Sequence, residues 1–221
     1  LPVVQDAMEL ADITPDQLDA VAVANQPGLT IALMVGVTAA KTLAWAWDKP
    51  LLGVDHVQAH LHSVALHRSD SPAPETPAFP AVGLVVSGGH TALYTLRGFD
   101  EITLVGSTID DAVGEAYDKV SAILGLGYPG GPVIDKLSSV GDPGAVRFPR
   151  TLLDRDSLDF SFSGLKTAVL RWVQSKEMEE EIGARRALLR RNPHPAVEEW
   201  LKVTPQATLD VIAAFQRVVV E

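Results

Sequence analysis

Two histidines four residues apart are the first candidates for chemistry. In a helix, His56 and His60 would lie one turn apart on one face, with Cβ atoms about 5–6 Å apart, so both imidazoles could bind one metal ion. Imidazole nitrogens suit zinc or iron, and carboxylate or water would complete the site. Val57 stands where a zinc protease of the His-Glu-x-x-His type has its glutamate base. The alternative is a surface helix that merely contains histidines.

The second candidate is a polar turn between two apolar runs, residues 81–86 and 91–96. Its sequence, Ser87-Gly88-Gly89-His90, predicts a β-hairpin, because adjacent glycines can adopt the positive φ angles of a tight turn. Backbone N–H groups facing open space and the Ser87 hydroxyl would then bind an anion such as a phosphate, carboxylate or carbamate. An ordinary hairpin turn without a ligand is the alternative.

Three carboxylates, Asp111, Glu115 and Asp118, are spaced four and three apart in a segment predicted to be helical from about residue 109 to 124. Like charges at that spacing repel by roughly 0.2–0.5 kcal/mol per pair, so we expect a metal, a ribose or a basic partner to face them. Lys119 lies one residue off this stripe and is expected to relieve little of the repulsion. A solvated acidic face is the alternative.

Three further features could bind a ligand or position a helix. Gly130 and Gly131 precede a helix predicted from Pro132, where a ligand could approach the backbone and Asp135 could accept from a hydroxyl. Ser163 is predicted to cap a later helix. An arginine cluster is the only obvious candidate for contacting phosphate backbones, although exposed helix faces often look like this: Arg185, Arg186, Arg190 and Arg191.

The elements that must position these residues alternate between strand and helix. A strand at 20–24, a helix at 30–47 and a strand at 51–54 predict an α/β fold with a partly parallel sheet. The proline-rich segment 69–80 predicts a boundary between a first domain, 1–78, and a second, 79–221. Because the chain begins and ends inside helical patterns, we expect an internal piece of a longer protein.

The composition limits the classes of function. With 18 Lys and Arg against 28 Asp and Glu, the net charge is -10, which argues against non-specific attraction to nucleic acid. The absence of cysteine rules out a disulfide scaffold and a thiolate metal site. No apolar run approaches membrane-spanning length, so we expect a cytoplasmic protein with no membrane partner.

In this order and together, the motifs strongly resemble the TsaD/Gcp family. The resemblance covers nearly the whole chain and rests on His56-x-x-x-His60 and on the motifs at 85–91, 110–119, 128–131 and 159–166. It implies the actin-like ATPase fold (ASKHA, ribonuclease-H-like), with two lobes around a nucleotide cleft. It also implies transfer of a threonylcarbamoyl group from its adenylate to the adenosine 3′ of the anticodon in tRNAs that read codons beginning with A.

The resemblance assigns roles to individual residues. It implies that His56 and His60 act through one divalent metal ion, iron or zinc, with magnesium as a further candidate ion. The ligand would be threonylcarbamoyl-adenylate or an ATP- or ADP-like nucleotide. The positions that would contact it are Val85, Val86, Ser87, Gly88, Gly89, Asp118, Gly131 and Asp135. The additional candidates are His90, Asp111, Glu115 and Lys166. The implied partners are tRNA, a paralogous TsaB-like subunit of the same fold and a small TsaE-like ATPase.

This chain also departs from the family pattern. The family's opening phosphate loop, a C-terminal Asn that contacts the nucleotide and the Asp that completes the metal site have no counterpart here, and Gln26 replaces a usual Gly. We therefore expect the full-length protein to be an active transferase and this chain alone to bind metal weakly and to turn over little or nothing. Two alternatives remain, a metal-dependent glycoprotein endopeptidase, which Val57 disfavours, and a non-catalytic nucleotide-binding scaffold.

Overall fold

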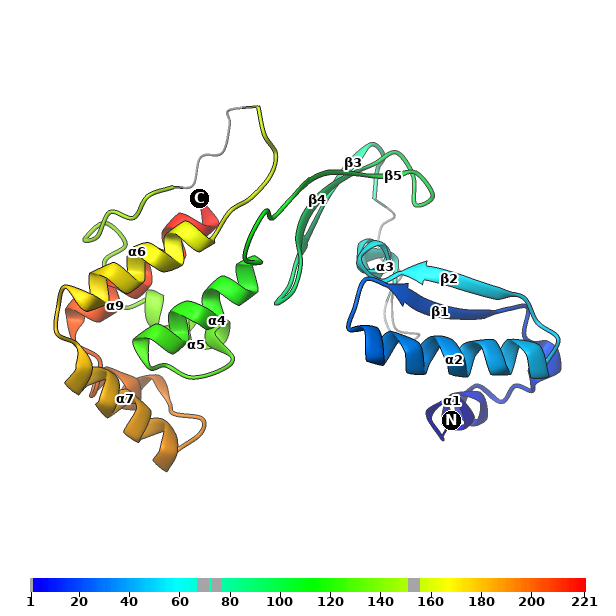
Figure 1. Cartoon of the computed structure of the whole chain (residues 1–221), viewed down its shortest axis with the longest axis horizontal. Coiled ribbons are helices and arrows are strands. Elements are labelled where there is room, and N and C mark those ends of the chain that lie inside the picture. Colours follow the sequence, from blue (N-terminus) through cyan, green and yellow to red (C-terminus); the bar gives the residue numbers. More distant parts are fainter. Residues whose placement is uncertain (1, 67–71, 73–76, 151–155) are drawn as a thin grey trace. The chain divides into compact units, whose positions relative to one another are not determined.

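The computed structural model describes residues 2–66, 72, 77–150 and 156–221. The chain divides into two compact units, Leu1–Phe79 and Pro80–Glu221 (Figure 1). The first contains a parallel sheet and the second an antiparallel one, so the α/β prediction is confirmed. Residues 69–71 and 73–76 of the predicted boundary lie outside the described residues. No described helix combines the length and the apolar character that crossing a bilayer requires.

The first unit is built around a parallel βαβ arrangement. Strand β1 (Val21–Gln26) pairs in parallel with β2 (Leu51–Asp55), and helix α2 (Thr30–Ala46) connects them (Figure 1). Parallel strands need such a crossover, because the chain must return along the sheet before it can run in the same direction again. Helix α1 (Pro2–Ala11) and a short 3₁₀ helix, Pro15–Gln17, precede β1.

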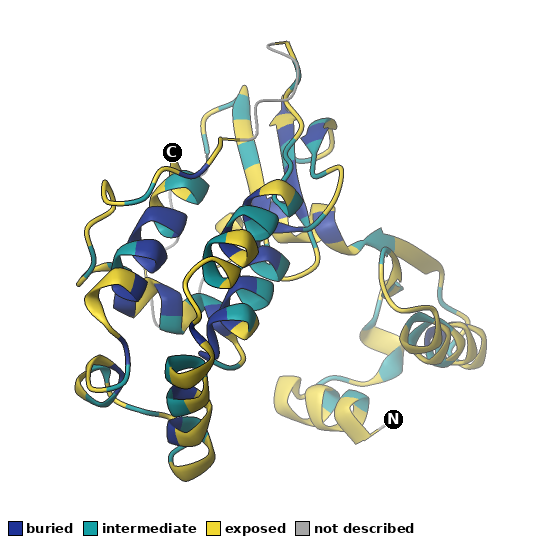
Figure 2. Cartoon of the chain, turned by 60° about the vertical axis from the view of Figure 1, so that its left-hand side comes forward, coloured by how far each residue is buried: buried dark blue, intermediate teal, exposed yellow. Residues whose placement is uncertain are grey.

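Helix α2 is apolar on more than one side. Ala40 and Ala44 are only 6% exposed. Trp45, in contrast, is 86% exposed, and Ile31, Met34 and Val35 are exposed as well. Figure 2 accordingly shows yellow over most of this helix. A sheet of two strands covers one side of a helix at most, so this unit keeps a large exposed apolar surface.

Helix α3 (His56–His62) begins directly after β2 because Asp55 caps it. The Asp55 carboxylate accepts hydrogen bonds from the backbone N–H groups of Val57 at 2.9 Å and Gln58 at 3.0 Å. Val57 and Leu61 form the buried side of the helix, at 6% and 7% exposure. His56 and His60 therefore lie on its exposed side.

The second unit opens with a three-stranded antiparallel sheet in the order β3-β4-β5. Strands β3 (Ala81–Val86) and β4 (Thr91–Leu96) form the predicted hairpin, with Val86 opposite Thr91. Strand β5 (Ile102–Ser107) pairs with the other edge of β4. The hairpin prediction is thus confirmed at both strands.

Six helices follow the sheet among the described residues of the second unit. The core lies between α4 (Val113–Leu124), α5 (Gly130–Ser138), α6 (Ser163–Gln174) and α9 (Gln206–Val220). Helices α7 (Glu179–Arg191) and α8 (Val197–Leu201) add Leu188 and Trp200 to it. Figure 2 shows their buried residues in dark blue. The core includes the fully buried side chains Val120, Leu124, Leu126, Ile134, Leu137, Val169, Val211, Ile212 and Phe215.

Helix α4 begins four residues later than predicted. Ile109, where the predicted helix would start, is instead 61% exposed. Its N–H donates to the carbonyl of Phe160 at 2.9 Å, so the chain here pairs with a distant segment before it turns into a helix. The N–H of Val113 then donates to the Thr91 hydroxyl at 2.9 Å. The prediction failed because these partners are far away in the sequence.

Arg185 corrects the prediction of an exposed arginine cluster. Its side chain is fully buried, whereas those of Arg186, Arg190 and Arg191 are exposed. The guanidinium donates from Nε to the carbonyl of Leu124 at 2.6 Å and from Nη1 to Glu181 at 2.7 Å. Leu124 is the last residue of α4, where a cation is favourable for the helix dipole. Arg185 thus joins α7 to the end of α4.

We expect Arg185→Met to lower the free energy of unfolding by about 3 kcal/mol, because it leaves Glu181 without its cation and Leu124 without its donor. Urea denaturation followed by circular dichroism measures this change. The matched control is Arg186→Met, at an exposed position, which should change the free energy of unfolding by less than about 0.5 kcal/mol. Equal effects of the two substitutions would contradict the structural role of Arg185.

Candidate functional site

The two histidines of α3 converge on each other. Their Nε2 atoms are 3.2 Å apart, and their ring centroids are 4.5 Å apart with the planes inclined at 67°. Two nitrogens bound to one tetrahedral zinc ion lie about 3.3 Å apart, so His56 and His60 fit two adjacent positions of such an ion. In the part of the chain that the structure describes, no group of three or more His, Cys, Asp or Glu side chains could hold a metal ion. The described residues thus place two imidazole nitrogens together but do not form a complete metal site.

Ser87 closes the hairpin turn. Its N–H donates to the carbonyl of His90 at 2.8 Å, and its hydroxyl oxygen accepts from the N–H groups of His90 at 3.0 Å and Gly89 at 3.4 Å. These two N–H groups, predicted to face open space, are therefore already bonded. Neither Gly88 nor Gly89 has a positive φ, so the prediction that the turn needs glycine for its backbone angles is wrong.

Gly114, whose role sequence reasoning missed, lets the start of α4 pack against this turn. A Cβ at Gly114 would lie 2.7 Å from the carbonyl oxygen of Ser87 and 2.8 Å from the Cα of Gly88. The Gly114 N–H donates to that carbonyl at 3.3 Å. A Cβ at Gly88 or Gly89, in contrast, would meet nothing within 4 Å. One side of the turn is therefore packed, and the other is open to a ligand.

A cleft of about 1010 Å³ lies within the second unit. Its walls come from the hairpin turn, α4, α5, residues 159–162 and the end of α9. It brings together six of the predicted ligand contacts, namely Val86, Ser87, Gly88, Asp118, Gly131 and Asp135. Gly89 does not line it, and Val85 is 7% exposed within β3. A cleft of this size can hold a nucleotide-sized ligand.

Two carboxylates reach the cleft from neighbouring helices. Asp118 accepts a hydrogen bond from the Gly130 N–H at 2.7 Å, which fixes the first turn of α5 against α4. Asp135 accepts from the side-chain amide of Gln216 at 3.1 Å. Between them, a Cβ at Gly131 would meet nothing within 4 Å, so a ligand can approach the backbone there.

Tyr117 and Gln216 are cleft residues that sequence reasoning missed. The Tyr117 hydroxyl donates to the amide oxygen of Gln216 at 2.6 Å. Burial, and then the negative charge of Asp135, raise the pKa of Tyr117 to about 12. The signal in the sequence that could have found Gln216 is its position as a neutral polar residue directly after five consecutive apolar residues, 211–215.

The chain itself neutralises part of the predicted acidic stripe. Lys119 Nζ lies 2.6 Å from Asp111 and 2.9 Å from Glu115, and Lys166 Nζ lies 3.8 Å from Asp111. These carboxylates raise the pKa of Lys119. The expectation that Lys119 relieves little of the repulsion is wrong, because Asp111 precedes α4 and lies beside the lysine. These four residues and the half-buried His90 do not line the cleft.

Asp110 caps helix α6, a role predicted for Ser163. Its carboxylate accepts from the N–H groups of Phe162 at 2.8 Å and Ser163 at 3.3 Å, and from the hydroxyls of Ser161 and Ser163. Partial burial raises the pKa of Asp110, but these hydrogen bonds outweigh it and lower the pKa to about 2. Ser163 is instead the first residue of the helix.

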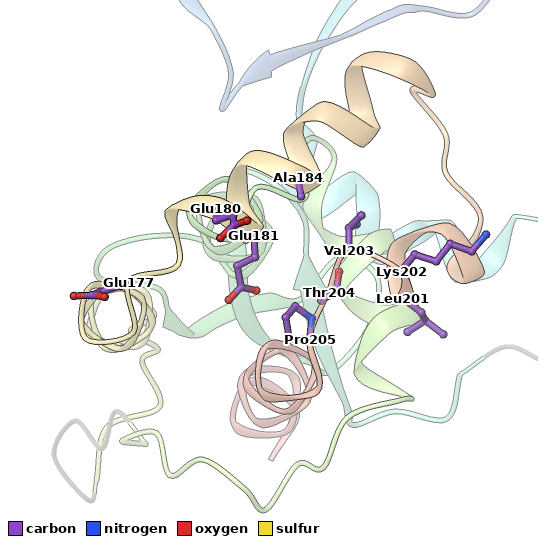
Figure 3. Close-up of a pocket in the computed structure, with 9 residues that line it drawn as sticks. All are labelled: Glu177, Glu180, Glu181, Ala184, Leu201, Lys202, Val203, Thr204 and Pro205. Atoms are coloured by element: carbon purple, nitrogen blue, oxygen red, sulfur yellow. The ribbon is translucent and has the colours of Figure 1, made fainter.

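A second cavity, of about 430 Å³, lies between α7 and residues 201–205 (Figure 3). Glu177, Glu180 and Glu181 line it, and Glu181 also accepts from the Thr208 hydroxyl at 2.8 Å. The hydroxyl of Thr204 is buried there and lacks a partner among the described residues. None of the predicted site residues lines this cavity.

Comparisons with known proteins agree with the resemblance that the sequence motifs indicated. The family model described as "TsaD: tRNA N6-adenosine threonylcarbamoyltransferase" matches residues 1–221. A relative of that name from Koribacter versatilis is 48% identical over 236 residues, covering 100% of this chain and 62% of the relative. Another, from Anaeromyxobacter dehalogenans strain 2CP-1, is 54% identical over 180 residues, covering 81% of this chain and 52% of the relative. The chain thus spans about half to three fifths of their length.

Among solved structures, YeaZ from Pseudomonas aeruginosa aligns at a TM-score of 0.33 and 15% identity, covering 80% of this chain and 76% of that chain. This likeness is too low to support an inference about fold or partners.

The cap on α6 generates a stability prediction. Asp110→Ala should lower the free energy of unfolding by about 1 kcal/mol at pH 7. The pKa of Asp110 falls from 3.8 to about 2 on folding, so its stabilisation is present above the higher value and is lost as the pH falls through the lower. The difference between the two proteins should therefore shrink between about pH 4 and pH 2.

Urea denaturation across this pH range measures the effect of Asp110→Ala. Asp156→Ala is the matched control, because Asp156 is exposed and has no side-chain partner among the described residues. A difference between the Asp110 variant and the unaltered protein that stays constant down to pH 2 would show that the ionised carboxylate does not stabilise α6.

Proposed function

The chain belongs to the TsaD family of tRNA N6-adenosine threonylcarbamoyltransferases, and from this premise we propose a function for the full-length protein. It transfers threonylcarbamoyl from threonylcarbamoyl-adenylate to the adenosine 3′ of the anticodon in tRNAs that read codons beginning with A. The observation that carries the proposal is the cleft of the second unit, which gathers six of the eight residues matching the family's ligand contacts.

The cleft has the chemistry that an acyl-adenylate needs. Its phosphate bears negative charge, which the open backbone at Gly88 would face. The Ser87 hydroxyl, which donates to the carbonyl of His90 at 3.3 Å, would have to exchange that acceptor for the phosphate. Its ribose bears hydroxyl donors, for which Asp118 and Asp135 are acceptors. Positioning the reactive carbonyl and stabilising the charge that develops on it would then provide much of the catalysis.

His56 and His60 are proposed as two ligands of a divalent cation, iron or zinc. The separation of their Nε2 atoms supports this role, and carboxylate or water would complete the coordination. Such a cation supplies Lewis-acid stabilisation to a carbonyl oxygen that gains negative charge. Peptide hydrolysis by the His-Glu-x-x-His mechanism gains no support, because position 57 carries a buried valine.

The proposal includes the setting in which the protein acts. The full-length protein would act in the cytoplasm on tRNA, together with a TsaB-like paralogue of the actin-like ATPase fold and a TsaE-like ATPase. The full-length protein would itself have the two-lobed actin-like ATPase fold.

In cells that depend on the full-length protein, we expect His56→Ala to abolish the threonylcarbamoyl modification of tRNA. The physical reason is that one imidazole cannot replace the paired nitrogen ligands. Mass analysis of tRNA nucleosides measures the modification. His62→Ala on the same helix is the matched control, because the Nδ1 atom of His62 lies 2.9 Å from the carbonyl of Gln58. Full modification in the His56 variant would refute the proposed role of the pair.

A substitution at Gly131 tests whether the cleft of the second unit binds the nucleotide. A methyl group at this position would clash with no protein atom but would enter the cleft, so Gly131→Ala should fold normally and bind ADP about tenfold more weakly. Calorimetric titration of the full-length protein measures the affinity. Gly183→Ala is the control, because Gly183 also has open space around it but lies on α7 away from the cleft. Unchanged ADP affinity in the Gly131 variant would place the nucleotide elsewhere.

A further inference from the structure

We propose that Gln216 is a positioning residue, which holds the carboxylate of Asp135 in the orientation that accepts hydrogen bonds from ligand hydroxyls. This inference rests on the proposed function, because it requires a ribonucleotide in the cleft. Gln216, Asp135 and Tyr117 all line that cleft, and each comes from a different helix. The three side chains form one continuous chain of hydrogen bonds.

Gln216 is the middle member of this chain. Its amide oxygen accepts from the Tyr117 hydroxyl at 2.6 Å, and its amide nitrogen donates to Oδ1 of Asp135 at 3.1 Å. Tyr117 is fixed in turn by edge-on packing against Phe215, with ring centroids 5.1 Å apart and planes inclined at 77°. The core of the unit thus holds one end of the chain, and the cleft contains the other.

The direction of the hydrogen bonds follows from the chemistry of Tyr117. Its pKa of about 12 keeps the hydroxyl protonated at neutral pH, and the proton is donated to the amide oxygen of Gln216. The amide nitrogen must then face Asp135. Without the Tyr117 hydroxyl, either the amide nitrogen or the amide oxygen of Gln216 could face the carboxylate, and the oxygen would be repelled by it.

Asp135 needs such a partner because it is exposed. An exposed aspartate on a helix samples several rotamers, and fixing one of them before a ligand arrives lowers the entropy lost on binding. Among the described residues, Gln216 is the one group that donates a hydrogen bond to this carboxylate. Oδ2 and the remaining lone pair of Oδ1 stay available for ligand hydroxyls.

The test compares two nucleotides on the full-length protein. Calorimetric titration with ADP and with 2′,3′-dideoxy-ADP measures how strongly the protein depends on the ribose hydroxyls. We expect the unaltered protein to prefer ADP by about tenfold or more, the range for hydrogen bonds to a charged group. Gln216→Leu should reduce that preference to about threefold or less.

Gln206→Leu is the matched control. Gln206 lies on the same helix and also donates to an aspartate, Asp210, at 2.8 Å, but neither residue lines the cleft. This variant should keep the preference of the unaltered protein. Tyr117→Phe, which removes only the hydroxyl that orients the amide, should lower the preference to a value between those of the unaltered protein and Gln216→Leu.

A double-mutant cycle separates positioning from a direct contact between Gln216 and the ligand. If Gln216 acts through Asp135, Gln216→Leu should change ADP affinity by less than about twofold in an Asp135→Ala background. Equal weakening of ADP and dideoxy-ADP by Gln216→Leu, or an undiminished effect in that background, would overturn the positioning role. Failure of the unaltered protein to bind ADP would instead refute the proposed function on which the inference rests.

Discussion

The packing of α4, α5 and α9 against one another is the constraint on which the cleft depends. Each of these helices contributes a polar cleft residue that directly follows a fully buried one, in the pairs Ala116 and Tyr117, Ile134 and Asp135, and Phe215 and Gln216. Because neighbouring positions of a helix point about 100° apart, burying the first residue of a pair fixes the direction of the second. The apolar core therefore determines where the hydrogen-bonding groups of the site lie.

Neighbouring aspartates before α4 show how one short segment can join several elements. Asp110 caps α6, whereas Asp111 pairs with Lys119 in α4. A third carboxylate, on Asp159, accepts from the N–H of Ser107 at 2.9 Å. Strand β5, α4 and the segment before α6 are thus held together by side-chain carboxyl groups whose partners lie within the same unit. This use is structural, although the residues resemble a cation site in the sequence.

Local features of the fold could be predicted from the sequence, because their causes lie within a few residues. The hairpin, the βαβ arrangement, the Asp55 cap and the exposed face of His56 and His60 all follow from periodicity and capping. The start of α4, the cap by Asp110 and the burial of Arg185 could not be predicted. The partners of Ile109 and Asp110 are 51 or more residues away. Arg185 also pairs with the nearby Glu181, but its bond to Leu124 spans 61 residues, and no local pattern indicates these distant contacts.

The same distinction applies to the candidate site. The residue types and spacing of Asp118, Gly131 and Asp135 indicated a ligand, and all three line one cleft. Tyr117 and Gln216 are separated by 99 residues, so only the tertiary structure reveals that they bond to each other. The ion pair between Lys119 and Asp111 could not be predicted for a related reason, because Asp111 lies before the helix, where helical spacing does not apply.

The close approach of Gly114 to the hairpin turn has a mechanical consequence. With backbone against backbone at this point, no flexible side chain separates the two elements, so a displacement of the turn would push directly on the first residues of α4. Asp118 in turn links α4 to α5 through Gly130. Donors on the turn and acceptors on the two helices would then meet an incoming molecule at a fixed mutual spacing, which favours ligands of one length over shorter or longer analogues.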